Sequence, residues 1–269
     1  MTNHNNIKNE TLHCYTDGQA YGRLKFSPMG NNAKLRQLVE STFGKGYKGY
    51  SFSLPSGHSC PFAKDCLSKS DRITGKITDG KDTLFRCFSA MDEARSSNAR
   101  AQRWHNFDIL RKMSFEEMVT EIDTSIPDDM GICLVHVGGD MFNQKYFEAW
   151  LEVARRHSQV IFYAYTKSIP YWIANIDRIP ENFSLNASRG SRVDGLIDEH
   201  DLKVAEVVYS LDEAIAKGLE IDHDESHAIK NNGSFALLIH GTQPSGSKAS
   251  EAIKELKRQN VKFSYSRKA

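Results

Sequence analysis

The chain has 269 residues, of which 39% are hydrophobic and 26% charged, and its formal net charge is +1 at pH 7. These proportions exclude a disordered or fibrous chain, and the near-neutral charge excludes a protein whose whole surface is built for nucleic acid. No apolar run reaches the roughly 18 residues that a membrane helix needs, and the start MTNHNNIKNE lacks a signal-peptide pattern. We therefore expect a cytoplasmic protein that does not contact a membrane.

The sequence predicts one domain behind an N-terminal extension, with the extension over residues 1–30 and the domain over residues 31–269. The domain begins with a helix and a strand, followed by a polar loop that contains cysteines and then by two helices. In chain order these elements are expected at residues 31–43, 50–54, 57–87, 88–113 and 114–122. The last helix starts at Ser114, whose spacing to Glu117 matches a capping box.

From residue 132 onward, apolar strands alternate with helical segments. The strands are expected at residues 132–137, 160–165, 183–187, 203–210 and 235–241, and an amphipathic helix at 143–158. This alternation indicates a parallel sheet. We expect an α/β fold built as a partial or complete β/α barrel of the TIM-barrel type. An open doubly wound sheet is the alternative, ranked second because no G-x-G-x-x-G or Walker loop follows any strand.

Ligands gather at the carboxyl ends of parallel strands in both architectures. The segments after the six strands read SGHSC, GGDMF, TKS, SRGS, SLDE and GTQP, and all are rich in small, polar or ionisable residues. They predict a pocket at this edge, although sharp turns explain some of the glycines. Lys167, Ser188 and Arg189 could hold a carboxylate, a phosphate or a ribose hydroxyl there, and a turn or an ion pair would explain each of them as well.

Five cysteines stand at positions 14, 60, 66, 87 and 133. In a reducing cytoplasm they point to burial, reactivity or metal binding rather than to disulfides. Cys133 lies in the apolar run GICLVHV and is interpreted as a core residue. Cys60, Cys66 and Cys87 lie among Gly, Pro, Lys, Asp and Ser, so apolar burial does not explain them.

The spacing of these three cysteines, C-x5-C-x20-C, is loose for zinc, whose structural sites pair cysteines about two to four residues apart. An iron-sulfur cube is larger and its irons lie at separate corners, so three thiolates on a wide loop suit a 4Fe-4S cluster with one open corner. Basic residues around the loop would offset the negative charge of a cluster, or are solvated: Lys64, Arg72, Lys76 and Arg86. The candidates for the fourth corner are His13, Cys14, His58 and His240.

Several segments resemble a family of phage proteins named after mycobacteriophage gene product eighty-eight. They are SFSLPSGHSCPFAKDC, FRCFSA, VHVGGDMFNQKYFEAW, IFYAYTKSIPYW, NFSLNASRGSR and IHGTQP, and they extend over roughly residues 30–245. This resemblance implies a phage-encoded protein in the host cytoplasm and no particular chemistry.

More distantly, the order of strand, cysteine loop, helix and a strand that ends in Gly-Gly-acid is similar to radical S-adenosylmethionine enzymes. That resemblance implies that the three cysteines hold a 4Fe-4S cluster whose open iron binds the methionine part of S-adenosylmethionine. The amino group of that cofactor would then bind to a shelf formed by Gly138, Gly139 and Asp140. The chain departs from the family pattern because a compact C-x3-C-x2-C is absent and an aspartate stands in place of the usual glutamate.

Three functions are therefore open. The first is a 4Fe-4S protein on a radical-S-adenosylmethionine-like barrel, with that cofactor as a second expected ligand and an unidentified substrate or redox partner. The second is a non-enzymatic 4Fe-4S protein for electron transfer or sensing, with a histidine on the fourth iron. The third is a zinc-stapled module that binds nucleic acid. The segment RAQRWHNF could serve the third function, but we expect a helix with Trp104 and Phe107 inward and the arginines outward.

Overall fold

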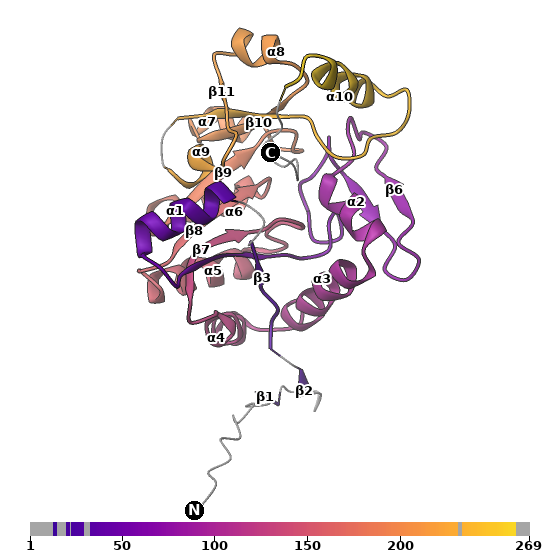
Figure 1. The fold of residues 1–269 in the computed structure, drawn as a ribbon. Coiled ribbons are helices and arrows are strands. Elements are labelled where there is room, and N and C mark those ends of the chain that lie inside the picture. The colour runs from indigo at the N-terminus through magenta and orange to yellow at the C-terminus, as the bar shows by residue number, and fades with distance from the viewer. Residues whose placement is uncertain (1–12, 15–19, 22, 30–32, 231–232, 262–269) are drawn as a thin grey trace, which may run out of the picture.

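The computed structural model describes residues 13–14, 20–21, 23–29, 33–230 and 233–261 (Figure 1). Its centre is an eight-stranded sheet with the strand order β11-β12-β10-β9-β8-β7-β4-β3. Neighbouring strands are parallel, except that β3 runs antiparallel to β4. The strands are β3 (Ser27–Pro28), β4 (Lys48–Phe52), β7 (Met130–Val135), β8 (Ile161–Thr166), β9 (Phe183–Ser188), β10 (Val204–Val208), β11 (Glu220–Ile221) and β12 (Phe235–Leu238).

Helices and two small sheets complete the described part of the chain. The helices are α1 (Ala33–Phe43), α2 (Phe88–Arg95), α3 (Ser97–Leu110), α4 (Phe115–Ser125), α5 (Gln144–Arg156), α6 (Ile169–Ile173), α7 (Gly195–Glu199), α8 (Leu211–Ala216), α9 (Ser226–Ile229) and α10 (Lys248–Arg258). The small sheets pair β1 (His13–Cys14) with β2 (Ala20–Tyr21), and β5 (Ser68–Ser70) with β6 (Ile77–Asp79). No helix in the described ranges is both long enough and apolar enough to span a membrane.

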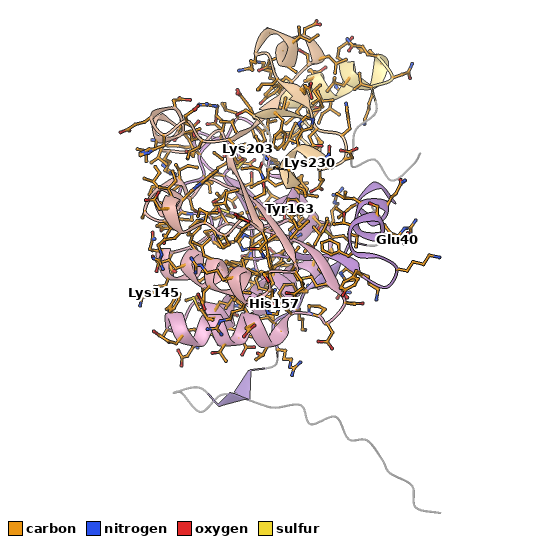
Figure 2. All side chains as sticks on the ribbon, turned by 90° about the vertical axis from the view of Figure 1, so that its left-hand side faces the viewer. Glu40, Lys145, His157, Tyr163, Lys203 and Lys230 are labelled. Carbon is orange, nitrogen blue, oxygen red and sulfur yellow. The ribbon has the colours of Figure 1, made fainter. Side chains whose placement is uncertain are left out.

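The two faces of the large sheet are covered by different helices. Apolar residues of α3, α4, α5, α6 and α7 pack against one face, whereas those of α1 and α9 pack against the other. Figure 2 shows this division: Lys145 of α5 lies to the left of Tyr163 in β8, and Glu40 of α1 lies to its right. Right-handed crossovers between strands that follow one another in order place the connecting helices on a single face in this way.

The expected strands are confirmed, and the chain forms a mostly parallel α/β sheet. Strands β4, β7, β8, β9, β10 and β12 lie side by side in chain order, so the sheet lacks the central reversal of a doubly wound fold. The complete barrel that was one expectation is wrong, because the sheet is open. Short edge strands explain this: β3 pairs with β4 and β11 pairs with β12, and these pairings occupy the backbone groups that closure would use.

The helix expected over residues 88–113 is two helices. Ser96 between them is extended, with φ −117° and ψ 105°, and its hydroxyl accepts a hydrogen bond from the Ala99 amide at 3.2 Å. Serine is a preferred N-cap because its oxygen satisfies an amide that the helix leaves unpaired. The capping box of α4 is confirmed, since Ser114 and Glu117 exchange hydrogen bonds of 3.2 and 2.7 Å.

A cluster of rings encloses His136 directly after β7. Its Nε2 lies 2.8 Å from the Tyr146 hydroxyl, and its ring centroid lies 6.1 Å from that of Phe52 and 6.5 Å from that of Trp150. Burial disfavours the charged imidazolium and lowers the pKa of His136 to about 3. The folded protein therefore keeps this imidazole neutral where an unfolded histidine takes up a proton.

We predict that His136 weakens the fold as the solution becomes acidic. Between the ordinary pKa of 6.5 and about 3, only the unfolded chain binds this proton, so the free energy of unfolding falls as pH falls through that window. The slope from this group approaches about 1.4 kcal/mol per pH unit. Urea unfolding of His136→Phe at pH 7, 5.5 and 4 should show a flatter profile than the wild type. His200→Gln, at an exposed position, should keep the wild-type slope, and an unchanged slope in His136→Phe would contradict the assignment.

Candidate metal centre

The carboxyl ends of four neighbouring strands carry the expected site residues, and backbone hydrogen bonds tie these ends together. After β4, the Leu54 amide donates to the carbonyl of Gly138 after β7 at 2.7 Å. The amides of Lys64 and Asp65 in the cysteine loop donate to the carbonyl of Gly190 after β9, at 3.3 and 3.1 Å. The cysteine loop is therefore fastened across the edge of the sheet from β4 to β9.

A hairpin brings Cys87 back beside Cys66 although 20 residues separate them. Strands β5 and β6 form this hairpin, and the chain after it returns along the cysteine loop, where the amides of Leu84 and Phe85 donate to the Asp65 carbonyl at 2.7 and 3.1 Å. The Cys87 amide then donates to the Ser68 hydroxyl at 3.4 Å. The hairpin thus returns Cys87 to the loop that carries Cys60 and Cys66.

The thiols of Cys60, Cys66 and Cys87 are half-buried and interact electrostatically with one another. Burial raises the pKa of all three thiols, to about 11 for Cys87. Negative charge adds to this effect: Cys87 and Cys66 raise the pKa of Cys60, and Cys66 raises that of Cys87. Three thiols that disfavour one another's charge are a donor set that a cationic metal centre would neutralise.

A backbone amide donates to one of the sulfurs, since the Gly57 amide lies 3.2 Å from Sγ of Cys60. Cys87 is the N-cap of α2, and its side chain makes no capping hydrogen bond. Burial raises the pKa of Cys87, and the nearby amides of Ser89 and Ala90 lower it in part. The N-terminus of a helix favours negative charge, so this position favours a thiolate.

Gly138 and Gly139 let the cysteine loop and α2 approach the end of β7. A Cβ on Gly138 would lie 2.1 Å from Oγ of Ser89 in α2. A Cβ on Gly139, whose φ is +85°, would lie 2.5 Å from Oγ of Ser59, next to Cys60. Gly138 and Gly139 were suggested by the sequence as a cofactor shelf. In the structure they are also the surface against which α2 and the loop around Cys60 pack.

A buried ion pair braces α2, and sequence reasoning missed it. Glu93 is fully buried and its Oε1 accepts from Nη1 of Arg103 and from the amide of Ser56, both at 2.9 Å. Nη1 of Arg103 also donates to the Ser89 carbonyl at 2.8 Å. The pair joins α3, α2 and the turn before Cys60. No sequence motif predicts this ion pair, because Glu93 and Arg103 have the sequence context of ordinary solvent-exposed helix residues.

Asp140 and Lys167 lie next to the thiols, but protein groups already bind them. Oδ1 of Asp140 accepts from the Thr166 hydroxyl at 2.6 Å and from the Met141 amide at 2.7 Å, and Oδ2 accepts from the Lys167 amide at 2.8 Å. Nζ of Lys167 donates to the carbonyl and hydroxyl of Ser188 and to the carbonyl of Arg189. The structure brings Asp140, Lys167 and Ser188 together as expected and joins the ends of three strands through them.

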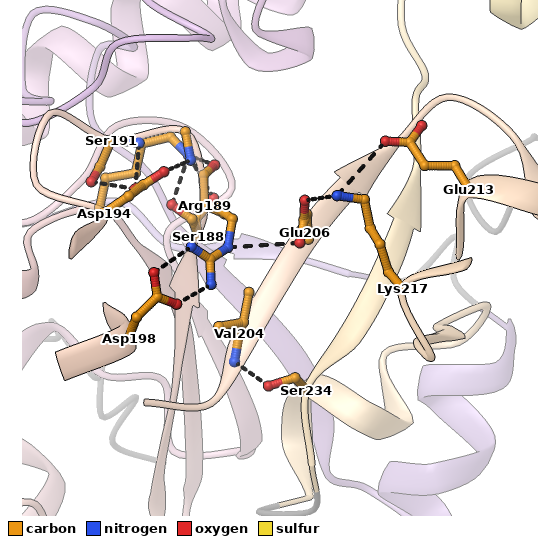
Figure 3. A network of polar contacts seen from close by, with 12 residues as sticks. Ser188, Arg189, Ser191, Asp194, Asp198, Val204, Glu206, Glu213, Lys217 and Ser234 are labelled. Atoms are coloured by element: carbon orange, nitrogen blue, oxygen red, sulfur yellow. Dashed lines mark hydrogen bonds and ion pairs between the residues drawn. The ribbon is translucent and has the colours of Figure 1, made fainter. Parts of the chain in front are cut away.

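The guanidinium of Arg189 points toward Asp198 and Glu206 (Figure 3). Its guanidinium donates to both carboxylate oxygens of Asp198 in α7, at 2.7 and 3.3 Å, and its Nε lies 3.7 Å from Glu206 in β10. Lys217 extends the chain of charges, with Nζ 2.8 Å from Glu206 and 4.0 Å from Glu213. The side chain of Arg189 is thus an ion-pair partner, and only its carbonyl contacts the residues beside the thiols.

The structure divides the candidates for the fourth corner. Nε2 of His58 lies 3.1 Å from the Ser70 carbonyl and its ring packs on Trp104, so it contacts the hairpin and α3. The ring of His240 packs on Phe88, directly after Cys87, at 4.9 Å between centroids. The side chains of His13 and Cys14 lie outside the described residues. Within the described residues, no three His, Cys, Asp or Glu side chains form a group that could hold a metal ion.

The expectation that the arginines of RAQRWHNF point outward is wrong. Arg100 and Arg103 are buried, because α3 turns them toward carbonyl groups of the hairpin and of α2. Trp104 is half-buried, with the Arg72 guanidinium 4.7 Å above its ring and the ring of His58 at 4.9 Å. Trp104 therefore stacks on side chains of the protein itself.

A family model described as Gene product 88 matches residues 24–260. The chain belongs to this family. The Gene 88 protein of Mycobacterium phage D29 is 27% identical over 151 residues, which are 51% of this chain and 56% of that protein. The alignment therefore covers little more than half the length of this relative. The match to the Gene product 88 model includes every candidate residue from Cys60 to His240, and it confirms the resemblance to the phage family.

We predict that Gly138→Ala destabilises the protein by about 1–3 kcal/mol, because the new methyl group overlaps Oγ of Ser89 and must displace α2. Urea unfolding measures this change. Gly195→Ala is the matched control, since a Cβ there meets no atom within 4 Å, and it should leave stability within about 1 kcal/mol of the wild type.

A double-mutant cycle tests the cause of that loss. Ser89→Ala removes the oxygen that the methyl group would meet, so Gly138→Ala should cost less in that background than in the wild type. Equal costs in the two backgrounds would show that the contact with α2 does not set the requirement for glycine.

Proposed function

We propose that Cys60, Cys66 and Cys87 bind a 4Fe-4S cluster at the carboxyl edge of the sheet. What supports this proposal is that the β5–β6 hairpin returns Cys87 to the loop that carries Cys60 and Cys66, although the sequence separates the three cysteines by 5 and 20 residues. The amide donor to Cys60 supports it, since hydrogen bonds to the sulfurs are a recurring part of iron-sulfur sites.

The positions of the cysteines in the chain also support a cluster. Cys60 and Cys66 lie in one loop, and Cys87 lies after the hairpin at the N-terminus of α2. When bound, such a cluster would supply one-electron chemistry. The residues of this chain would hold its sulfur ligands, orient them through the packing at Gly138 and Gly139, and shield them on one side by α2.

We infer further a partial β/α barrel similar to those of radical S-adenosylmethionine enzymes, with S-adenosylmethionine as the ligand of the open corner. Parallel strands in chain order, with their connecting helices on one face, support this inference. The position of Gly138, Gly139 and Asp140 after the second parallel strand supports it as well. Asp140 already accepts three hydrogen bonds, so the cofactor's amino group would share a carboxylate that also joins β7 to β8.

A non-enzymatic role in electron transfer or sensing is the second candidate. What favours it is that Asp140, Lys167 and Arg189 already use their polar atoms on protein partners. In this case His240, beside Phe88 and the N-terminus of α2, is the residue best placed to occupy the fourth corner.

We predict that anaerobically purified protein is brown and carries about four irons per chain. Alanine at Cys60, Cys66 or Cys87 should remove most of the iron and the broad visible absorbance. Cys133→Ala is the matched control, because this cysteine is buried in the core and should leave the iron content unchanged. Colourless wild-type protein that contains zinc would favour the third candidate, a zinc-stapled module, and normal iron in Cys87→Ala would refute the assignment of the third ligand.

We predict, under the enzymatic candidate, that S-adenosylmethionine changes the EPR spectrum of the reduced protein and yields 5'-deoxyadenosine. An unchanged spectrum and no 5'-deoxyadenosine in iron-loaded protein would leave the non-enzymatic candidate. His240→Ala would then be expected to alter the spectrum, because it removes the proposed fourth ligand.

A further inference from the structure

The segment that follows β12 lies against the chain on both sides of Cys87. This segment, residues 240–243, is called the strap below, and it leads from β12 toward α10. It contacts Arg86, which precedes Cys87, and two residues of α2, Phe88 and Arg95. The strap therefore joins the cysteine segment to the last strand of the sheet.

The side-chain amide of Gln243 takes the place of a strand partner for Arg86. Its Oε1 accepts from the Arg86 amide at 2.8 Å, and its Nε2 donates to the carbonyls of Arg86 and His240 at 3.1 and 3.0 Å. A glutamine amide has an acceptor oxygen and two N–H donors, and all of them are used here. One side chain thus binds both backbone groups of the residue before Cys87.

The other contacts of the strap lie on the far side of Cys87. The ring of His240 packs on Phe88, with 4.9 Å between centroids. Gly241 has a φ of +81°, and a Cβ there would lie 3.0 Å from Cβ of Phe88, so glycine lets the backbone pass close to this side chain. Oγ1 of Thr242 accepts from Nη1 of Arg95 at 3.5 Å.

The strap is less firmly packed than the elements at its two ends. Ile239 before it and Ala249 in α10 are buried in the apolar cluster that contains β12. Gly241 and Thr242 are exposed, and hydrogen bonds and a ring contact hold the strap. Segments with few buried apolar contacts open at a lower free energy than the core. The strap can therefore open while the sheet stays folded.

We propose that the strap is a releasable closure for Cys87. When the hydrogen bonds between Gln243 and Arg86 break, water takes their place, the backbone beside Cys87 becomes free to move, and the half-buried thiol becomes accessible. This inference does not depend on a bound cluster, because the contacts that carry it lie within the chain.

The first test measures how fast iodoacetamide alkylates each cysteine of the reduced, chelator-treated full chain. Gln243→Ala should raise the rate at Cys87 about fivefold or more, because one lost hydrogen bond shifts an opening equilibrium by about that factor. The rates at Cys60 and Cys66 are internal references and should stay close to the wild-type values. Trypsin digestion of the quenched samples places the three cysteines on separate peptides, residues 49–64, 65–69 and 87–95.

The second test is tryptic cleavage of the native protein as purified. Trypsin must bind the backbone groups of Arg86 that Gln243 holds, so Gln243→Ala should speed cleavage of the chain after residue 86. Gln259→Ala is the matched control, because this glutamine lies exposed at the end of α10, where Nε2 donates to Glu255 at 3.2 Å. It should leave both rates unchanged.

The outcomes are distinct. Faster alkylation of Cys87 without a change at Cys60 and Cys66, together with faster cleavage after Arg86, supports the strap. An unchanged rate at Cys87 overturns the inference, whatever the cleavage rate. Equal acceleration at all three cysteines, or unchanged cleavage, opposes it, because the loop would then move without release of Arg86.

Two further results are separable from these. If Gln243→Ala does not fold by circular dichroism, Gln243→Glu replaces it, because glutamate keeps the size of the side chain and removes both N–H donors. The same increases are expected, and an unchanged rate at Cys87 in that variant overturns the inference. Wild-type protein without iron would refute the proposed cluster and leave the strap unaffected.

Discussion

The site depends on one close contact. The backbone at Gly138 and Gly139 packs directly against α2 and against the cysteine loop. One glycine admits α2 and the other admits the turn that leads to Cys60, so a single dipeptide sets how near the first and third cysteines lie to the sheet. The Leu54 amide fixes the same dipeptide to the strand that precedes the cysteine loop. The distances among the thiols are therefore a property of sheet packing rather than of a self-contained loop.

Buried charge is arranged around this contact in opposed pairs. Arg103 forms an ion pair with Glu93 beside α2, and Asp140 accepts from the Lys167 amide at the ends of β7 and β8. Each charged group also has hydrogen bonds to backbone or hydroxyl groups, which is the condition under which burial of an ion is tolerated.

Much of the fold was predictable because its signals are local. Period-two and period-3.6 patterns located the six parallel strands, and the spacing of Ser114 and Glu117 located a helix start. The break at Ser96 was missed because the apolar spacing of the helix continues across it. Whether the sheet closes could not be predicted, because an edge strand of two residues is too short to show an alternating hydrophobic pattern. Among the site residues, Lys167 and Asp140 were suggested by their place after strands. Glu93 and the inward turn of Arg103 depend on how α2 meets α3, which no single segment records.

The hairpin between Cys66 and Cys87 has a consequence for how such sites are recognised across sequences. The return of the chain depends on its closing contacts, in which Asp79 accepts from Ser68 at 2.9 Å and from Arg86 at 2.8 Å. Residues beyond those contacts could be added or removed without moving either thiol, since loop length adds only slowly to the cost of closure. A search that counts residues between cysteines would overlook relatives with a longer or shorter hairpin. A search for the paired strands that bring the cysteines together would find them.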